Sequence, residues 1–324
     1  MERQVDFWHE RHMLCEGCTE EFVVDLDWID RWEQSGEQCP GCGLTCEHED
    51  APRVTVDPAD LALNDELVVQ LSWFHTSTHA DWPTKDFKPE AGLTPQTRMR
   101  MGGGARVASW AARQRAKALH VGTYEAAVHN MLRRIDDQAD HGRQFYLYRV
   151  QLRPSVVVGK GWVVDPSDWL GDVALEHLCP PGVDVVRYLN HHEDPGGLSL
   201  ALGRGAIASV QRIAVPLADG WDVVWVREAA AALERASDTL GPATGRLGRF
   251  RPPLSSRAAL AGALVVALAE RLPANLRDQF DSATRFEEGA DPVQWARQAS
   301  CLYGLVADPD RVLAALDRQV IRAV

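Results

Sequence analysis

The sequence predicts an α+β protein in three parts: a small cysteine-rich unit, a central domain on a curved or split β-sheet, and a helical C-terminal region. Three observations support this. Five of the seven cysteines lie within residues 15–46. Short β-type runs with Gly- and Pro-rich breaks follow, with only a few helical runs between them. After residue 222 the chain is rich in Ala and Leu at helical spacing. Few helices among several strands are typical of an α+β domain.

Composition sets the expected domain boundaries. With 324 residues the chain is long enough for two or three domains. Residues 1–50 form the cysteine-rich unit, and residues 51–66, which contain Pro and several Asp, form a connector. The central domain is expected over residues 67–216 and the helical region over residues 217–324.

Charge and hydropathy exclude some function classes. Residues 1–66 carry 18 Asp and Glu but 4 Lys and Arg, a balance of −14 within a total of −12. This acidic segment repels phosphate backbones, although the near-neutral remainder leaves room for a local basic patch. The longest apolar run, residues 258–268, is too short to span a bilayer, so no membrane partner is expected. The polar N-terminus is unlike a secretory signal, and the expected compartment is a reducing cytoplasm.

Two Cys-x2-Cys pairs, separated by twenty residues, predict a zinc knuckle. Each pair lets two thiolates approach one ion from a tight turn, and glycine in both turns lets the backbone fold beneath the metal. Four thiolates satisfy tetrahedral Zn²⁺ without an open position, so a structural role is expected. Cys46 and His48 follow closely, and either could replace one ligand. The expected ligands are Cys15, Cys18, Cys39 and Cys42.

The central region is expected to consist mainly of strands. One helix is predicted over residues 124–135, because Ala127, Met131 and Ile135 recur every four residues. The strands are expected over residues 68–76, 116–123, 145–152, 183–189, 198–202 and 208–215.

The C-terminal region is expected to hold five helices. Ser255 or Ser256 can cap the second helix, and the Asp-Pro pairs at residues 291–292 and 308–309 fit a cap followed by proline. The expected helices are Arg227–Thr239, Ser256–Leu272, Ala274–Phe286, Pro292–Val306 and Pro309–Arg322.

Four pieces of the central region, in their order and spacing, resemble the ADP-ribosyltransferase superfamily. The first, WFHTS at residues 73–77, is similar to the opening strand, which ends in a His followed by a small residue. The second, LHVGTYEAA at residues 119–127, is similar to the strand-then-helix unit of that family. The third, residues 145–154, resembles the next strand. The fourth, residues 185–199, resembles a Tyr-x-Asn-x-x-Glu stretch, and residues 207–210 match the usual final strand.

The resemblance implies that NAD is the substrate and that ADP-ribose passes to a macromolecular acceptor, a protein or a nucleic acid. Breaking the bond between nicotinamide and ribose requires an oriented ribose and a carboxylate near the developing positive charge. By the resemblance, His75 bonds the ribose, the Thr76 backbone holds the amide, and His120 packs against nicotinamide. The expected NAD-binding residues are His75, Thr76, Ser77, His120 and Thr123, and the expected catalytic residues are Glu193, His75 and His120.

A His, His and Glu set departs from the commoner His, Tyr and Glu set of the family. The second histidine of this set, His120, is similar to the corresponding residue of the tRNA 2′-phosphotransferase branch. Members of that branch rely on arginines instead of a glutamate. Two alternatives therefore stay open: an inactive nucleotide- or protein-binding module, and an RNA 2′-phosphotransferase-like enzyme. Thr123 is most simply a helix N-cap. Glu176 and Glu125 are the next candidates for the carboxylate.

Overall fold

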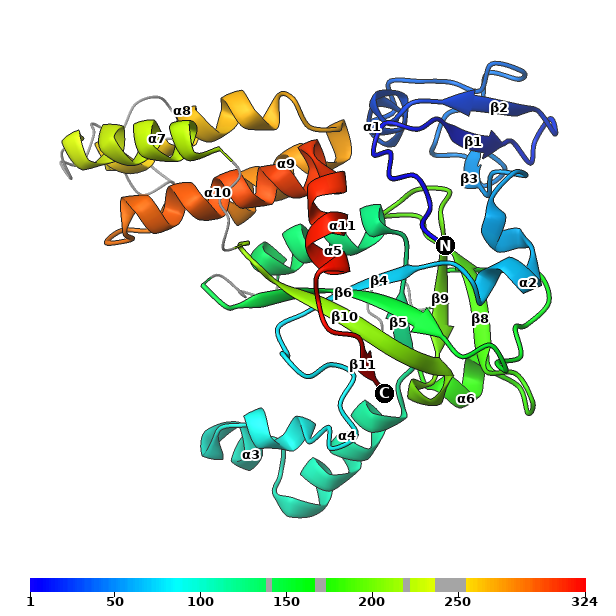
Figure 1. Cartoon of the computed structure of the whole chain (residues 1–324). Coiled ribbons are helices and arrows are strands. Elements are labelled where there is room, and N and C mark those ends of the chain that lie inside the picture. Colours follow the sequence, from blue (N-terminus) through cyan, green and yellow to red (C-terminus); the bar gives the residue numbers. More distant parts are fainter. Residues whose placement is uncertain (138–141, 167–172, 218–221, 237–254) are drawn as a thin grey trace.

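The computed structural model describes residues 1–137, 142–166, 173–217, 222–236 and 255–324. Within these ranges the protein has the predicted mixed α+β character, with three sheets and helices on either side of them. A small N-terminal unit lies at one end of the molecule, two sheets lie in the middle, and helices gather above them (Figure 1).

The N-terminal unit is a three-stranded sheet with one helix. The outer strands of this sheet pair antiparallel with the middle one, in the order β2-β1-β3. Its third strand comes from the segment expected to be a connector, so the unit extends beyond residue 50. Met13, Ile29 and the ring of Trp28 contribute to its small core. The elements are β1 (Arg11–Leu14), β2 (Glu21–Val24), α1 (Leu26–Glu33) and β3 (Arg53–Thr55).

Two four-stranded sheets form the middle of the molecule. One holds β4 (Trp73–Ser77), β6 (Phe145–Leu152), β10 (Ile207–Val215) and β11 (Arg322–Ala323), in the antiparallel order β11-β10-β6-β4. The other holds β5 (Leu119–Val121), β7 (Val163–Val164), β8 (Val185–Leu189) and β9 (Leu198–Leu202), in the order β5-β9-β8-β7. Only β7 and β8 pair in parallel among these strands.

The two sheets meet where β4 crosses β5. Phe74 and Gly122 exchange backbone hydrogen bonds of 2.8 and 2.9 Å at this junction. A Cβ atom on Gly122 would lie 2.8 Å from Ser199 Oγ and 3.0 Å from Ala126 Cβ, so this close approach requires glycine. The junction therefore brings the ends of two strands and the start of the next helix together.

Two of the strand predictions are wrong in part, because helices occupy some of their residues. Residues 65–68 are helical, since the Asn64 side chain caps that turn, and the strand begins only at Trp73. Residues 104–116 form a long helix, which leaves three residues for the strand expected over 116–123. The shorter elements here are η1 (Leu61–Leu63), α2 (Asp65–Val68), η2 (Pro89–Gly92), α3 (Pro95–Arg100), α4 (Gly104–Ala116), α6 (Leu175–Leu178) and η3 (Arg204–Ala206).

The predicted central helix is confirmed as α5 (Tyr124–Asp137). Thr123 caps it, because its Oγ1 accepts the Ala126 N–H at 3.0 Å. The apolar face packs into the largest core cluster, together with the C-terminal helices. The Tyr124 hydroxyl, which is fully buried, donates to the Leu305 carbonyl at 2.9 Å. The helical region therefore shares one core with the first central sheet.

The C-terminal helices begin at caps of the predicted kind. Ser255 caps α8, while Asp291 and Asp308 cap α10 and α11 ahead of a proline. The first helix begins earlier than expected, after Asp222, and residues 237–239 of its prediction lie outside the described residues. No helix in the described ranges has the length and apolar character needed to cross a membrane. The helices are α7 (Val223–Arg235), α8 (Ser256–Ala269), α9 (Ala274–Ala283), α10 (Pro292–Ala307) and α11 (Pro309–Asp317).

The end of the chain corrects the last helix prediction. The helix expected over residues 309–322 stops at Asp317, and residues 322–323 form strand β11 on the edge of the first central sheet. Gln211 of β10 donates to the carbonyl groups of Leu316 and Gln319 at 3.0 Å each, which fixes the turn between helix and strand. The final residues of the helical region therefore belong to the central sheet.

Candidate functional site

The four predicted metal ligands lie together. Their Sγ atoms are all within 4.8 Å of one another, with Cys15 to Cys42 at 3.7 Å and Cys18 to Cys39 at 3.6 Å. Four sulfurs about 2.3 Å from one tetrahedral zinc ion would be about 3.8 Å apart, so the observed set fits such an ion. Cys46 is instead beside Ser35, with 3.3 Å between Sγ and Oγ. The four thiols can hold a metal such as zinc.

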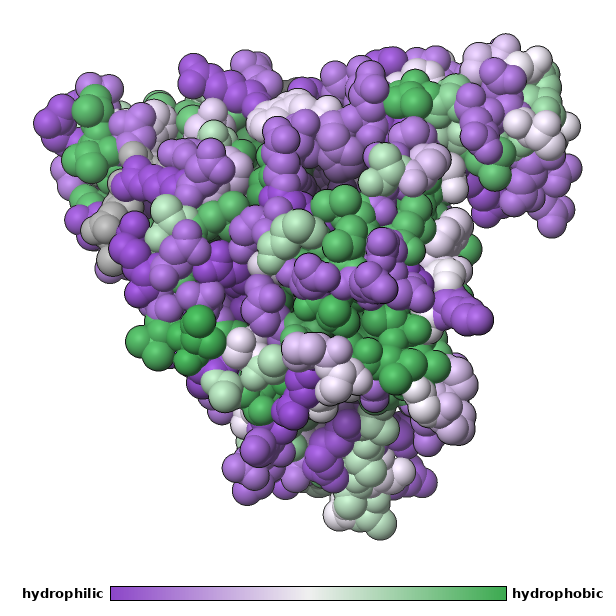
Figure 2. Space-filling view, turned by 45° about the vertical axis from the view of Figure 1, so that its right-hand side comes forward, coloured by the Kyte–Doolittle hydropathy of each residue, from purple (hydrophilic) through white to green (hydrophobic). Residues whose placement is uncertain are grey.

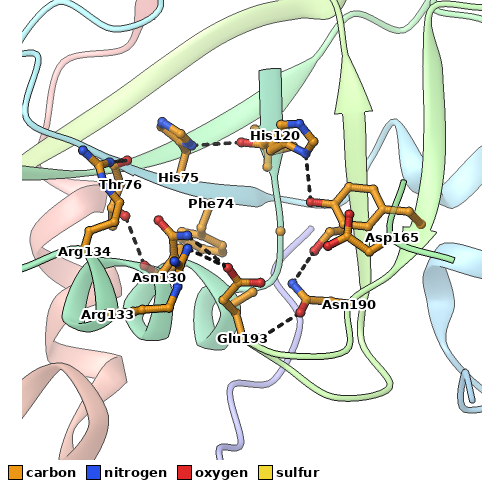
Figure 3. Close-up of a pocket in the computed structure, with 16 residues that line it drawn as sticks. Phe74, His75, Thr76, His120, Asn130, Arg133, Arg134, Asp165, Asn190 and Glu193 are labelled. Carbon is orange, nitrogen blue, oxygen red and sulfur yellow. Dashed lines mark hydrogen bonds and ion pairs between the residues drawn. The ribbon is translucent and has the colours of Figure 1, made fainter. Parts of the chain in front are cut away.

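A second candidate site is a pocket of about 260 Å³ at the junction of the two central sheets. Strands β4 and β5, the ends of β8 and β9, and one face of α5 line it. Figure 3 shows the two histidines on adjoining strands and Glu193 facing the helix. Four of the predicted residues lie here, although they come from three separate stretches of sequence: His75, Thr76, His120 and Glu193.

His75 is held as a neutral ring. Burial, reinforced by the positive charge of Arg134, lowers the pKa of His75 to about 3, although the hydrogen bond to the His120 backbone opposes this shift. Its Nδ1 lies 2.9 Å from the backbone oxygen of His120, and its ring stacks on Trp82 with centroids 4.0 Å apart. Because a carbonyl oxygen only accepts, Nδ1 carries the hydrogen and Nε2 is left as an acceptor. A neutral acceptor of this kind suits a ribose hydroxyl.

His120 has one ring nitrogen without a partner. Its Nδ1 lies 3.1 Å from the Tyr188 hydroxyl, while its buried Nε2 has no hydrogen-bond partner among the described residues. Burial lowers the pKa of His120 and raises that of Tyr188. Buried polar atoms usually have a hydrogen-bond partner, so an unpaired nitrogen in a pocket indicates a position where a ligand or a water molecule can bind.

Glu193 is carried by a short loop that Asn190 organises. The Asn190 side-chain oxygen accepts the backbone N–H groups of residues 192, 193 and 194 at 3.0, 2.8 and 3.3 Å. Glu193 Oε1 then accepts from Asn130 at 3.1 Å and from Arg133 at 3.4 Å, and its side chain is only 13% exposed. The loop and the helix together fix one carboxylate at the pocket wall.

Sequence reasoning missed three pocket residues on α5, namely Asn130, Arg133 and Arg134. They are three and four residues apart, so they share one helix face opposite the buried apolar stripe. Arg134 Nη1 donates to the Thr76 carbonyl oxygen at 3.4 Å, which engages the backbone expected to hold the nicotinamide amide. The polar face of the predicted amphipathic helix was the signal that could have found them. Asp165 also lines the pocket and had no such signal.

Two of the predicted NAD-binding residues lie elsewhere. Ser77 Oγ accepts the backbone N–H of His79 at 3.1 Å, and Thr123 caps α5. Neither is among the residues that line the pocket. Of the alternative carboxylates, Glu125 is buried on the other side of the junction and accepts the Asp6 N–H at 2.7 Å, while Glu176 is exposed on α6. Burial raises the pKa of Glu125 to about 7.

A buried ion pair joins the N-terminal unit to the loop that carries Glu193. Arg11 of β1 and Asp194 lie 3.2 Å apart, and the side chains of both are 2% exposed. The other oxygen of Asp194 accepts the Thr123 hydroxyl at 2.7 Å. A Cβ on Gly197 would lie 2.3 Å from that oxygen, so this loop can close only with glycine there. The loop is therefore clamped between the cysteine-rich unit and the start of α5.

The neutral state of His75 predicts a loss of stability on acidification. An unfolded His75 has a pKa near the ordinary value of 6.5, and burial lowers it to about 3 in the folded protein. The stability that the neutral His75 ring contributes is therefore complete above about pH 6.5 and is lost as the pH falls. The equilibrium constant for unfolding should rise by up to about tenfold for each pH unit. Urea unfolding between about pH 7 and about pH 4.5 should depend less on pH in His75→Phe than in wild type. Parallel curves for the two proteins would contradict a neutral buried His75.

Comparison of the chain with protein-family models, curated proteins and solved structures gives no match.

Proposed function

We propose that the junction pocket binds NAD and transfers its ADP-ribose to a macromolecular acceptor. The observation that supports this most is that the predicted catalytic residues lie in one pocket. His75, His120 and Glu193, predicted as one catalytic set from segments up to 118 residues apart, line the same pocket. His75 and His120 lie within strands β4 and β5, and Glu193 lies in the loop after β8.

Each residue has a chemical role in this proposal. Nε2 of His75 accepts a hydrogen bond from a ribose hydroxyl, and the unpaired Nε2 of His120 meets the nicotinamide side of the substrate. The Glu193 carboxylate stabilises positive charge that develops on the ribose as the bond to nicotinamide breaks. Arg133 and Arg134, at the edge of the same wall, can face the negative pyrophosphate.

The reaction balances without a further reactant. The bond between the ribose C1 atom and the nicotinamide nitrogen breaks, and neutral nicotinamide leaves with the electron pair. A nucleophilic oxygen or nitrogen of the acceptor then forms the new bond to the same carbon and loses its proton to solvent. The protein contributes orientation and electrostatic stabilisation.

The cysteine knuckle has a structural role in this proposal. Four cysteine ligands leave no open position for a substrate at a tetrahedral zinc ion. The knuckle instead fixes β1, whose Arg11 pairs with Asp194 beside the proposed catalytic carboxylate. A bound zinc ion would therefore influence the pocket through the position of this loop.

NAD binding is the first expected result. Calorimetry should show that one NAD binds per chain, and that His75→Ala weakens the affinity about tenfold or more, because one buried hydrogen bond to a ribose is lost. A matched control is His177→Ala on α6, which is exposed and outside the pocket. Labelled NAD should then release nicotinamide in a cell extract. No binding at millimolar NAD would leave only a module for another ligand.

The two pocket arginines favour a second candidate, the RNA 2′-phosphotransferase-like enzyme. Arg133 and Arg134 stand beside two histidines, and enzymes of that branch rely on arginines. An RNA that carries an internal 2′-phosphate separates the two activities. Removal of that phosphate in the presence of NAD, undiminished in Glu193→Gln, would favour this second candidate.

A further inference from the structure

The segment between strands β4 and β5 is strongly basic. Residues 84–117 carry 8 Lys and Arg but 2 Asp and Glu, a net charge of +6, so the other 290 residues carry −18. This segment contains η2, α3 and α4, which we call the basic hairpin. Figure 1 shows α3 and α4 projecting below the central sheets. A local concentration of positive charge on an acidic protein is the electrostatic signature of a polyanion-binding surface.

The basic side chains of this hairpin face solvent. Lys117 is half-buried, and the one ion pair that the described structure shows within the hairpin joins Arg115 to Glu90 at 3.2 Å. In Figure 2 apolar residues gather in the middle of the visible face, and hydrophilic ones are frequent at its upper and lower ends. The exposed basic residues are Lys85, Lys88, Arg98, Arg100, Arg106, Arg113 and Arg115.

The hairpin consists of regular helices with defined caps and contacts. Thr94 caps α3, accepting the Thr97 N–H at 3.1 Å, and α4 buries Val107 and Ala111. Arg98 Nε donates to the Leu93 carbonyl at 3.2 Å, and the same guanidinium also donates to the Glu90 carbonyl. Side chains seven residues apart on a helix, such as Arg106 and Arg113, lie on one side about 10 Å apart. The positive charges are thus spread over a surface that can follow an extended polyanion.

The hairpin is also close to the pocket along the chain. It is inserted between β4 and β5, and both of these strands contribute to the pocket wall. Lys117, at its end, is three residues before His120. The most acidic part of the protein, the N-terminal unit, lies at the other end of the molecule (Figure 1). This separation of charge would favour the approach of a polyanion to the hairpin and disfavour its approach to the N-terminal unit.

We propose that the basic hairpin binds the phosphate backbone of a nucleic acid and presents it to the pocket as the ADP-ribose acceptor. Charges distributed along two helices match a polymer of phosphates better than a single phosphorylated side chain, which needs arginines that converge on one point. The binding half of this inference stands alone, whereas the acceptor half rests on the proposed function.

The test measures binding without NAD, so its failure is distinct from failure of the proposed transfer. Fluorescence anisotropy would use labelled single-stranded DNA, RNA of the same sequence, and the DNA duplex, each of about 20 nucleotides. The triple variant Arg100→Gln, Arg106→Gln and Arg113→Gln should weaken binding of the preferred strand about tenfold or more at low salt, and should reduce the slope of log affinity against log salt by about 2.

A second triple variant controls for charge. Arg227→Gln, Arg235→Gln and Arg318→Gln remove the same charge from exposed positions on α7 and beside α11, and should leave affinity within about twofold. Circular dichroism would verify that both variants keep the wild-type melting curve. If the two variants lose affinity equally, if no strand binds, or if polyglutamate competes as well as nucleic acid, the hairpin is not a nucleic-acid site.

With NAD present, the strand that binds best should acquire the label from adenine-labelled NAD, and the hairpin variant should label it more slowly at limiting strand concentration. If the protein labels itself or another protein while the strand stays unlabelled, the proposal of NAD-dependent transfer stands. The proposal that a nucleic acid is the acceptor is then contradicted. Absence of any transfer, despite strand binding, would instead overturn the proposed function.

Discussion

Glu193→Gln is expected to lower the rate of ADP-ribosyl transfer about a hundredfold or more while NAD affinity stays within about twofold. The carboxylate acts on charge that develops only in the transition state, so its loss affects the rate and not ground-state binding. The substitution keeps the size of the side chain. Its amide oxygen can still accept from Asn130 and Arg133, so the loop should stay in place.

Two comparison variants make this result specific. Glu176→Gln changes an exposed carboxylate outside the pocket and should keep wild-type turnover. His75→Ala should lower both rate and affinity, because an oriented ribose helps both states. Single-turnover kinetics and calorimetry on the same preparations separate these outcomes. Wild-type turnover in Glu193→Gln would mean that the carboxylate is wrongly assigned, and Asp165, the other carboxylate that lines the pocket, would be the next candidate.

Loss of the metal is expected to unfold the N-terminal unit and leave the central sheets folded. Elemental analysis should find one zinc per chain, and Cys39→Ser should abolish its retention. The unit has a small core, so a bound zinc ion would supply most of its folding free energy, about 10–16 kcal/mol in comparable small zinc domains. Hydrogen exchange should show rapid exchange over residues 11–55 in the variant.

The buried ion pair extends this effect to the pocket. When β1 unfolds, Asp194 loses Arg11 and becomes a buried carboxylate without its cation, which typically costs about 3–5 kcal/mol. The central sheets should therefore melt at a lower temperature and bind NAD more weakly. Cys46→Ser is the matched control, because Cys46 contacts Ser35 and lies outside the four-sulfur cluster. Zinc loss in Cys46→Ser, or equal unfolding of both parts in Cys39→Ser, would contradict this arrangement.

Local patterns predicted much of the fold. The caps at Thr123, Asp291 and Asp308 and the strand over residues 145–152 follow the sequence closely. Two strand predictions were wrong at their first residues, because the short helix α2 and the end of helix α4 occupy those positions. Residues 104–116 lack a strong apolar stripe, because only Val107 and Ala111 are buried, so periodicity gave no sign of α4.

The candidate site was predicted in part. Side chains on the predicted strands, such as His75 and His120, could be identified because strand patterns are visible in the sequence. The polar face of α5 and Asp165 were missed, since their role depends on which elements pack beside them. Ser77 was expected in the pocket, yet its hydroxyl serves the turn after β4.

The sequence by itself determined that the four cysteines come together as a group that can hold a metal, since two Cys-x2-Cys pairs can fold onto one point through local turns alone. It also determined the starts of five of the six helices that it predicted, because a cap interacts with backbone groups only a few residues away. Tertiary structure alone decided that β4 meets β5, that Arg11 pairs with Asp194, and that the chain end joins the sheet as β11. These contacts join residues far apart in sequence, and their stability comes from burial and pairing that no local pattern encodes.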